Sequence, residues 1–197
     1  MLWHHLIKIG DWQFLLKLQG FRLNIRTRGD DARVPNTSLF VTFLDYDNIV
    51  GTNSEDPERR LKEELRFLQI AREIGNFHVF GTSDSGRHAV CIDCLPFVEV
   101  HETVRLSTCD IMFTRGPRIS EYRSWVLRTY PKGKRPAPKY LYTVESPYEG
   151  DNLQSLPHAN YLFEKFGLSL ALKNPFTLTG QNGMAVEQAY NTYEKKA

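Results

Sequence analysis

The chain has few of the features that mark membrane-embedded or secreted proteins. It contains no run of about 18 or more apolar residues, so no membrane-spanning helix is predicted. Its N-terminus lacks the order of a secretory signal, because Asp11, Gln13 and Lys17 soon interrupt the apolar residues. Only three cysteines occur, an odd number in a chain long enough to fold without disulfides. We therefore expect reduced thiols, no membrane association and a soluble, cytoplasmic protein.

A large net charge is also missing. Lys and Arg number 25 against 23 Asp and Glu, which gives a formal charge of +2. The hydrophobic content of 41% and charged content of 24% exclude wholesale disorder and coiled-coil rods and are typical of a folded domain. The near-neutral total conceals a basic segment. Residues 115–139 hold eight basic residues and one acid, a local charge of +7 that leaves −5 elsewhere, as a site that handles phosphate would need.

Hydrophobic periodicity predicts an α/β (α+β) domain with a mixed sheet flanked by helices. Strands are predicted at 21–26, 39–44, 77–80, 89–92, 125–127 and 140–144. Helices are predicted at 58–74, 97–108, 159–166 and 184–194. Loops are predicted at 29–31, at 35–36 and in the Arg- and Gly-rich stretch before Trp125.

Two acids follow the best-defined strand. Residues 39–44 deliver Asp45 and Asp47 at the strand end, where local twist or a bulge can bring both carboxylates to one cation. Carboxylate oxygens suit Mg²⁺ or Mn²⁺, which normally bridge carboxylates to substrate phosphates. The alternative interpretation is a pair of polar residues that leave a buried strand for a turn.

Two further segments carry groups that bind phosphate. In the polar turn 82–88, the hydroxyls, the guanidinium of Arg87 and the imidazole of His88 suit a phosphate, although an ordinary hairpin turn explains them too. The basic run 128–135 suits a triphosphate or a nucleic-acid backbone, and Tyr130 or Trp125 would stack on a base. Its alternative is a solvated basic loop.

Together these motifs resemble the archaeo-eukaryotic primase superfamily. The resemblance covers about residues 39–142 and depends on Asp45-Tyr46-Asp47, the turn 83–88, the later lone Asp110, and the segment 125–133. It implies an RRM-like catalytic core and a two-metal nucleotidyltransferase, a DNA primase or polymerase. Such an enzyme uses two Mg²⁺ or Mn²⁺ ions and nucleoside triphosphates, and it extends or synthesises primers on a DNA template.

The resemblance also implies roles for particular residues. The catalytic, metal-binding acids would be Asp45, Asp47 and Asp110, and the nucleotide-binding residues Ser83, Ser85, Arg87, His88, Arg128 and Lys132. Asp93 and Glu99 are alternatives to Asp110 as the third acid. Asp84 and Arg87 depart from the small residues more common at their positions in such turns.

The expected organisation is one primase-polymerase-like domain over 1–197. It comprises an N-terminal lobe at 1–38, a catalytic core at 39–144 and a packing segment at 145–197. A chain of this length has no room for an attached helicase, so we expect any unwinding to come from a separate protein. A structural zinc site is a minor possibility for Cys91, Cys94, His101 and Cys109, whose spacing is not that of a recognised zinc ribbon.

Two other functions also fit this sequence. The segments 43–49 and 82–85 also resemble acid-bearing motifs of the NYN/PIN group of Rossmann-like metal-dependent nucleases, which would use Asp84 as a ligand and would not need His88. A non-catalytic nucleic-acid-binding module for replication initiation is the other alternative.

Overall fold

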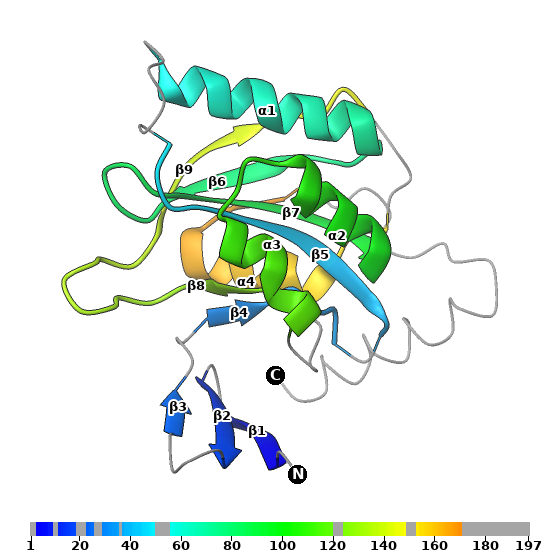
Figure 1. Ribbon diagram of the computed structural model, residues 1–197. Helices are drawn as coiled ribbons and strands as arrows, with labels where there is room; N and C mark the ends of the chain where they lie inside the picture. The colour runs from blue at the N-terminus through cyan, green and yellow to red at the C-terminus, as the bar shows by residue number, and fades with distance from the viewer. Residues whose placement is uncertain are drawn as a thin grey trace.

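The structure, a computed structural model, describes residues 3–9, 12–18, 23–25, 29–35, 37–49, 56–119, 124–148 and 153–170. The strands are β1 (Trp3–Ile9), β2 (Trp12–Leu18), β3 (Leu23–Ile25), β4 (Gly29–Asp31), β5 (Leu39–Tyr46), β6 (Phe77–Gly81), β7 (Arg87–Pro96), β8 (Val126–Arg128) and β9 (Lys139–Val144). The helices are α1 (Pro57–Arg72), α2 (Phe97–Leu106), α3 (Ile111–Ile119) and α4 (Leu156–Phe166). Their arrangement is drawn in Figure 1.

Three antiparallel sheets organise these strands. The central sheet has the order β5-β7-β6-β9, and every pairing in it is antiparallel. A two-stranded sheet joins β4 to β8, and β1, β2 and β3 form a third sheet in sequence order. The described part of the chain is therefore a mixed α/β fold of antiparallel sheets flanked by helices.

Helices cover both faces of the central sheet. Helix α1 begins after Asp56, whose carboxylate accepts the backbone N–H of Arg59 at 3.0 Å, and it buries Leu61, Leu65 and Leu68. Helices α1 and α2 lie on one face, and α4 lies on the other (Figure 1). The core extends through both layers, since residues of β5, β6 and β7 that face either way are buried.

Most of the predicted elements are confirmed with shifted ends. The strand predicted at 39–44 extends through Tyr46 in the structure, so Asp45 belongs to β5 itself. The strand predicted at 89–92 spans ten residues in β7 and includes His88. The helix predicted at 184–194 lies outside the described residues.

Two loop predictions are wrong. Residues 29–31 form strand β4, because their backbone pairs with β8, and Gly29 has no side chain to collide with Leu127. The stretch before Trp125 contains helix α3, which begins after Asp110. Among the described residues, none of the helices is both long enough and apolar enough to cross a lipid bilayer.

Candidate functional site

Asp45 and His88 form the centre of the candidate site. They are directly opposite each other on the antiparallel strands β5 and β7, so their side chains leave the same face of the sheet. His88 Nε2 lies 3.4 Å from Asp45 Oδ1. The histidine side chain is only 6% exposed, whereas the aspartate side chain is 32% exposed. The carboxylate therefore reaches solvent, and the buried imidazole lies beside it.

Asp110 is brought to this strand end from a distant part of the chain. Its backbone N–H donates to the carbonyl oxygen of Asp45 at 2.7 Å. Its carboxylate oxygen Oδ1 accepts the backbone N–H groups of Met112 at 2.7 Å and Phe113 at 3.2 Å, so Asp110 also caps the N-terminus of α3. The same residue thus starts a helix and lies beside Asp45.

Asp47 and Asp110 line a cleft between the end of β5, the start of α1 and the segment before α3. Its volume is about 500 Å³. Glu63 and Glu64 contribute two more carboxylates to its wall, and Arg60 contributes a guanidinium. The predicted acids therefore gather around one end of β5, with Asp45 on the side of His88 and with Asp47 and Asp110 in this cleft.

Glu64 holds the segment that carries Asp110, and the sequence alone did not indicate it. Its Oε1 accepts the Tyr46 hydroxyl at 3.0 Å and the Thr108 backbone N–H at 2.7 Å. Its Oε2 accepts the Thr108 hydroxyl at 2.6 Å. One carboxylate thereby ties α1 to β5 and to the residues just before Asp110. Only a pairing of distant chain segments creates this role, and no local pattern signals it.

Arg128 lies beside Asp45 and fastens the loop that follows β8. Its guanidinium donates to the carbonyl oxygens of Tyr130 at 2.8 Å, Pro136 at 2.6 Å and Thr82 at 3.2 Å. Burial and the neighbouring Arg135 lower the pKa of Arg128, and the Asp45 carboxylate partly offsets them. Arg128 therefore places a positive charge near Asp45 while bonding three backbone oxygens.

The turn 82–88 is braced by its own residues. Ser83 Oγ accepts the backbone N–H of Gly86 at 2.9 Å. Arg87 donates to the carbonyl oxygens of Ser83 and Gly86, and it forms an ion pair with Glu58 at 2.5 Å. Because Arg87 pairs with Tyr46 across the strands, it points toward α1, away from the face of His88. The structure thus separates Arg87 from the His88 side of the sheet.

The remaining predicted nucleotide-binding residues lie in turns. The carbonyl oxygen of Ser85 accepts the backbone N–H of Ile49, which joins the turn to the segment after β5. Lys132 lies in an exposed turn between β8 and β9 and is paired through its backbone with Arg135. None of the hydrogen bonds and ion pairs described above joins the Lys132 side chain to Asp45.

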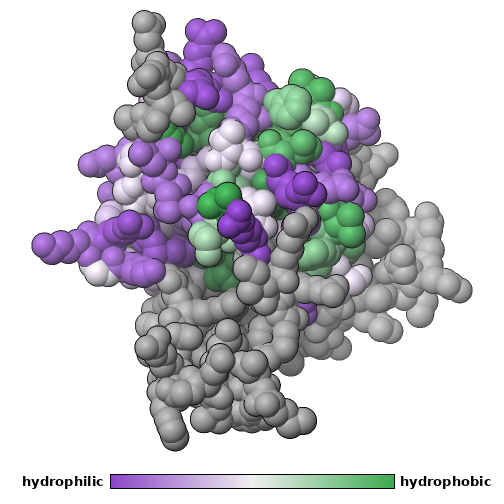
Figure 2. Space-filling view, viewed as in Figure 1, coloured by the Kyte–Doolittle hydropathy of each residue, from purple (hydrophilic) through white to green (hydrophobic). Residues whose placement is uncertain are grey.

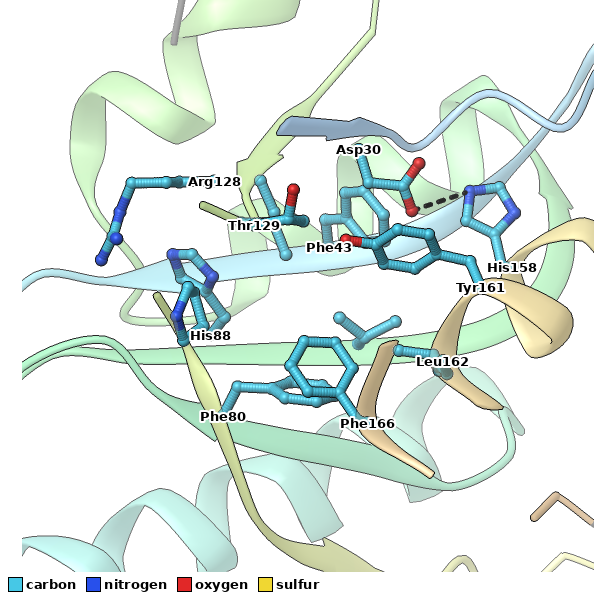
Figure 3. Close-up of a pocket in the computed structure, with 13 residues that line it drawn as sticks. Asp30, Phe43, Phe80, His88, Arg128, Thr129, His158, Tyr161, Leu162 and Phe166 are labelled. Atoms are coloured by element: carbon cyan, nitrogen blue, oxygen red, sulfur yellow. Dashed lines mark ion pairs between the residues drawn. The ribbon is translucent and has the colours of Figure 1, made fainter. Parts of the chain in front are cut away.

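A second cavity lies between the sheet and α4 (Figure 3). His88 and Phe80 of the sheet, Arg128 of β8 and Phe166 of α4 are among its lining residues, but its volume is only about 30 Å³. A cavity of this size has room for a few water molecules. His158 closes its far end, with Nδ1 bonded to Ser155 Oγ at 2.5 Å.

The stacking role suggested for Trp125 is wrong. The indole is 2% exposed and stacks on Phe97 in the core, with ring centroids 5.2 Å apart. Tyr130 is covered on one face by Lys165, whose Nζ lies 3.7 Å from the ring centroid. Trp125 is therefore closed to a base, and Lys165 occupies one of the two faces of Tyr130.

Neither alternative to Asp110 approaches Asp45 in the interactions described. Asp93 is buried, and its Oδ2 accepts the backbone N–H of Gly75 at 2.7 Å. Glu99 lies exposed in the first turn of α2. Asp110 is the candidate that shares a backbone hydrogen bond with Asp45.

Mg²⁺ and Mn²⁺ are the metals that the resemblance implies for these acids. The described residues hold no group of three or more His, Cys, Asp or Glu side chains arranged to bind a metal ion. Mg²⁺, however, is usually held by one or two carboxylates together with substrate phosphates. Asp47 and Asp110, which line one cleft, fit that mode of binding, whereas the Asp45 carboxylate lies on the His88 side of the strand end.

The four possible zinc ligands, by contrast, do not gather into one metal-binding group. Burial raises the pKa of the Cys91 thiol and raises the pKa of Cys94 to about 12, so both are protonated as free thiols. Cys91, Cys94, His101 and Cys109 all belong to the described residues, in which no metal-binding group of three forms.

Comparison of the chain with protein-family models, with curated proteins and with solved structures gives no match.

Proposed function

We propose that this chain is a metal-dependent nucleotidyltransferase of the primase-polymerase type that extends or synthesises primers on a DNA template. One observation carries the proposal. The backbone hydrogen bond between Asp110 and Asp45 joins two acids that are distant in sequence, at the strand end where His88 lies 3.4 Å from the Asp45 carboxylate. Acids at one strand end, with an imidazole and a guanidinium beside Asp45, suit a metal-bound triphosphate.

An RRM-like core is the finer fold that we propose. The order β5-α1-β6-β7-α2, with β5 and β6 on either side of β7 and both helices on one face, supports it. These elements follow the β-α-β-β-α part of the ferredoxin-like arrangement. The fourth strand, β9, lies beside β6 rather than beside β5.

The proposed mechanism relies on positioning and charge. Two divalent ions would lower the pKa of a primer 3′-hydroxyl and neutralise the triphosphate as pyrophosphate leaves. Asp45, Asp47 and Asp110 would hold them. His88 would donate a hydrogen bond to a phosphate oxygen, and Arg128 would add positive charge beside it. Arg87 is not included, because it pairs with Glu58 toward α1.

Primer extension tests this proposal directly. The protein is incubated with Mn²⁺, labelled nucleoside triphosphates and a primed DNA template, and the product length is measured. We expect extension by the wild type, and a loss of at least about 100-fold in Asp45→Asn. Glu164→Gln makes the same chemical change on the exposed side of α4 and should retain activity. Full activity in Asp45→Asn would refute the assignment.

The same assay separates the alternatives. Shortened DNA would indicate a nuclease of the NYN/PIN kind. The sheet argues against that reading, because Rossmann-like folds are built on parallel strands and every pairing described here is antiparallel. DNA binding that persists in EDTA without incorporation would indicate a non-catalytic module.

A further inference from the structure

The connection between β8 and β9 is an ordered basic loop, residues 130–139, which we term the basic hairpin. Lys132 and Arg135 exchange two backbone hydrogen bonds, each 3.0 Å long. Gly133 between them has a φ of 59°, a left-handed conformation that glycine adopts without strain. In Figure 1 the hairpin projects from the left of the molecule, and Figure 2 shows a strongly hydrophilic projection at the same place.

The base of the basic hairpin is fixed to the sheet. Arg128 bonds the carbonyl oxygens of Tyr130 and Pro136, which lie on its two arms, and also that of Thr82 next to β6. Lys139 at its far end pairs with Gly81 in the β6–β9 ladder. The hairpin is therefore held at both ends beside the turn that leads to His88, and it needs little ordering before it binds a partner.

Positive charge is concentrated on this hairpin. Its four cations are all exposed, and the sequence contains no acid between residues 122 and 144. These cations are Lys132, Lys134, Arg135 and Lys139. Arg135 lies close enough to Arg128 to contribute to lowering its pKa, after the larger effect of burial. Like charges held together on a fixed loop repel each other, and a bound anion relieves that repulsion.

The hairpin exposes its charged groups more than its one aromatic ring, that of the half-buried Tyr130. Lys165 covers one face of Tyr130, and Trp125 is buried in the core. Stacking is therefore limited to the other face of Tyr130 and is sequence-tolerant, whereas phosphate groups match the exposed ammonium and guanidinium groups of the loop.

We propose that the basic hairpin binds the sugar-phosphate backbone of a nucleic-acid strand without base preference and holds that strand beside Asp45 and His88. This inference rests on the proposed function for its choice of partner, and it assigns that partner to a surface outside the carboxylate site. Lys134 and Arg135 at the tip contact phosphates, and Arg128 keeps the loop in place.

Binding in EDTA, without nucleotides, tests the hairpin separately from catalysis. Fluorescence anisotropy is measured with a labelled 30-nucleotide oligothymidine and with a mixed-sequence strand of the same length, over a series of salt concentrations. In Lys134→Glu/Arg135→Glu we expect at least tenfold weaker binding to both strands and a salt slope reduced by about 1 to 2. The matched control, Arg66→Glu/Arg105→Glu, changes the net charge equally at exposed helix positions and should lose less than threefold.

Three results would overturn the inference: equal losses in the two double variants, no binding by the wild type, or a preference of more than tenfold for one strand. Lys134→Arg/Arg135→Lys should bind like the wild type, because it keeps both charges. The outcomes are independent of polymerisation. If the hairpin variants lose binding while the wild type extends no primer, the proposed enzymatic function fails and the binding surface stands. If Asp45→Asn abolishes extension but the hairpin variants bind normally, the proposed enzymatic function stands and the binding surface fails.

Discussion

His78 on β6 is buried beside Thr143 of β9, to which its Nδ1 is hydrogen bonded at 2.9 Å. Burial lowers its pKa to about 4, from an ordinary value of 6.5. The unfolded chain therefore takes up a proton between pH 6.5 and pH 4 that the folded chain does not. The contribution of His78 to stability is present above pH 6.5 and is lost as the pH falls toward 4.

We expect His78→Gln to flatten part of this pH dependence. Glutamine can still hydrogen bond to Thr143 but does not titrate. Urea unfolding at pH 7 and pH 4.5 should show the wild type losing up to about 3 kcal/mol more than the variant between the two values. Equal losses in both proteins would show that this histidine does not control the acid sensitivity.

Gly29 is required where β4 approaches β8. A Cβ atom at this position would lie close to the Leu127 carbonyl group, 2.9 Å from its carbon and nearer still to its oxygen. Because a backbone atom cannot move aside as a side chain can, we expect Gly29→Ala to destabilise the fold by about 1–3 kcal/mol. In Gly29→Ala, amide hydrogen exchange should accelerate more in β8 than in β6. Unchanged exchange in β8 would contradict this explanation.

Helix α1 does more than cover the sheet. Its Glu64 carboxylate binds both the backbone N–H and the hydroxyl of Thr108, and so presses the segment before α3 against β5. Thr108 lies two residues before Asp110, whose backbone N–H donates to the Asp45 carbonyl oxygen. The helix therefore contributes to the geometry of the candidate site without lining its His88 side.

Glu64→Ala should loosen this segment. We expect amide exchange at Thr108 to accelerate by about tenfold, because a hydrogen bond to a charged acceptor is worth about 1.5 kcal/mol or more. Under the proposed function, Mn²⁺ affinity should fall with it. Tyr46→Phe removes the other partner of Glu64 and leaves both Thr108 bonds in place, so it should exchange like the wild type at Thr108. Equal amide exchange at Thr108 in the two variants would show that Glu64 does not hold this segment.

The elements that the sequence predicted are those with a strong local pattern. Strand β5 and helix α1 have continuous apolar runs or helical spacing, and both are present. Helix α3 was missed because Gly116 and Pro117 favour a loop, although Asp110 caps its first turn. Strand β4 was missed because its residues are typical of turns, and its partner β8 lies far away in the sequence.

For the whole molecule, the sequence indicated the residues of the candidate site but not their division between two faces. Asp45 and His88 were expected together and are opposite one another in the sheet. The pairing of Arg87 with Glu58 could not be read from the sequence, because it depends on which face of β7 meets α1. The metal, substrate and partner of the chain stay predictions.

Helix α4 has one buried face and one exposed face. Leu162 is buried against the sheet, while its neighbour Phe163 is 58% exposed. We expect Leu162→Ala to lower the free energy of unfolding by about 2–4 kcal/mol, because it leaves a cavity between α4 and the sheet. Phe163→Ala should change it by no more than about 0.5 kcal/mol. Urea unfolding measures both, and similar values would show that α4 does not pack as described.

Neighbouring residues of β7 serve different layers, since Arg87 joins α1 through Glu58 while His88 meets Asp45 on the other face. Side chains alternate along a strand, so a shift of the register by a single residue would exchange them. An arginine would then enter the layer under α4, and the imidazole would turn toward Glu58. An insertion or deletion that shifts the register of β7 by one residue would therefore dismantle the site.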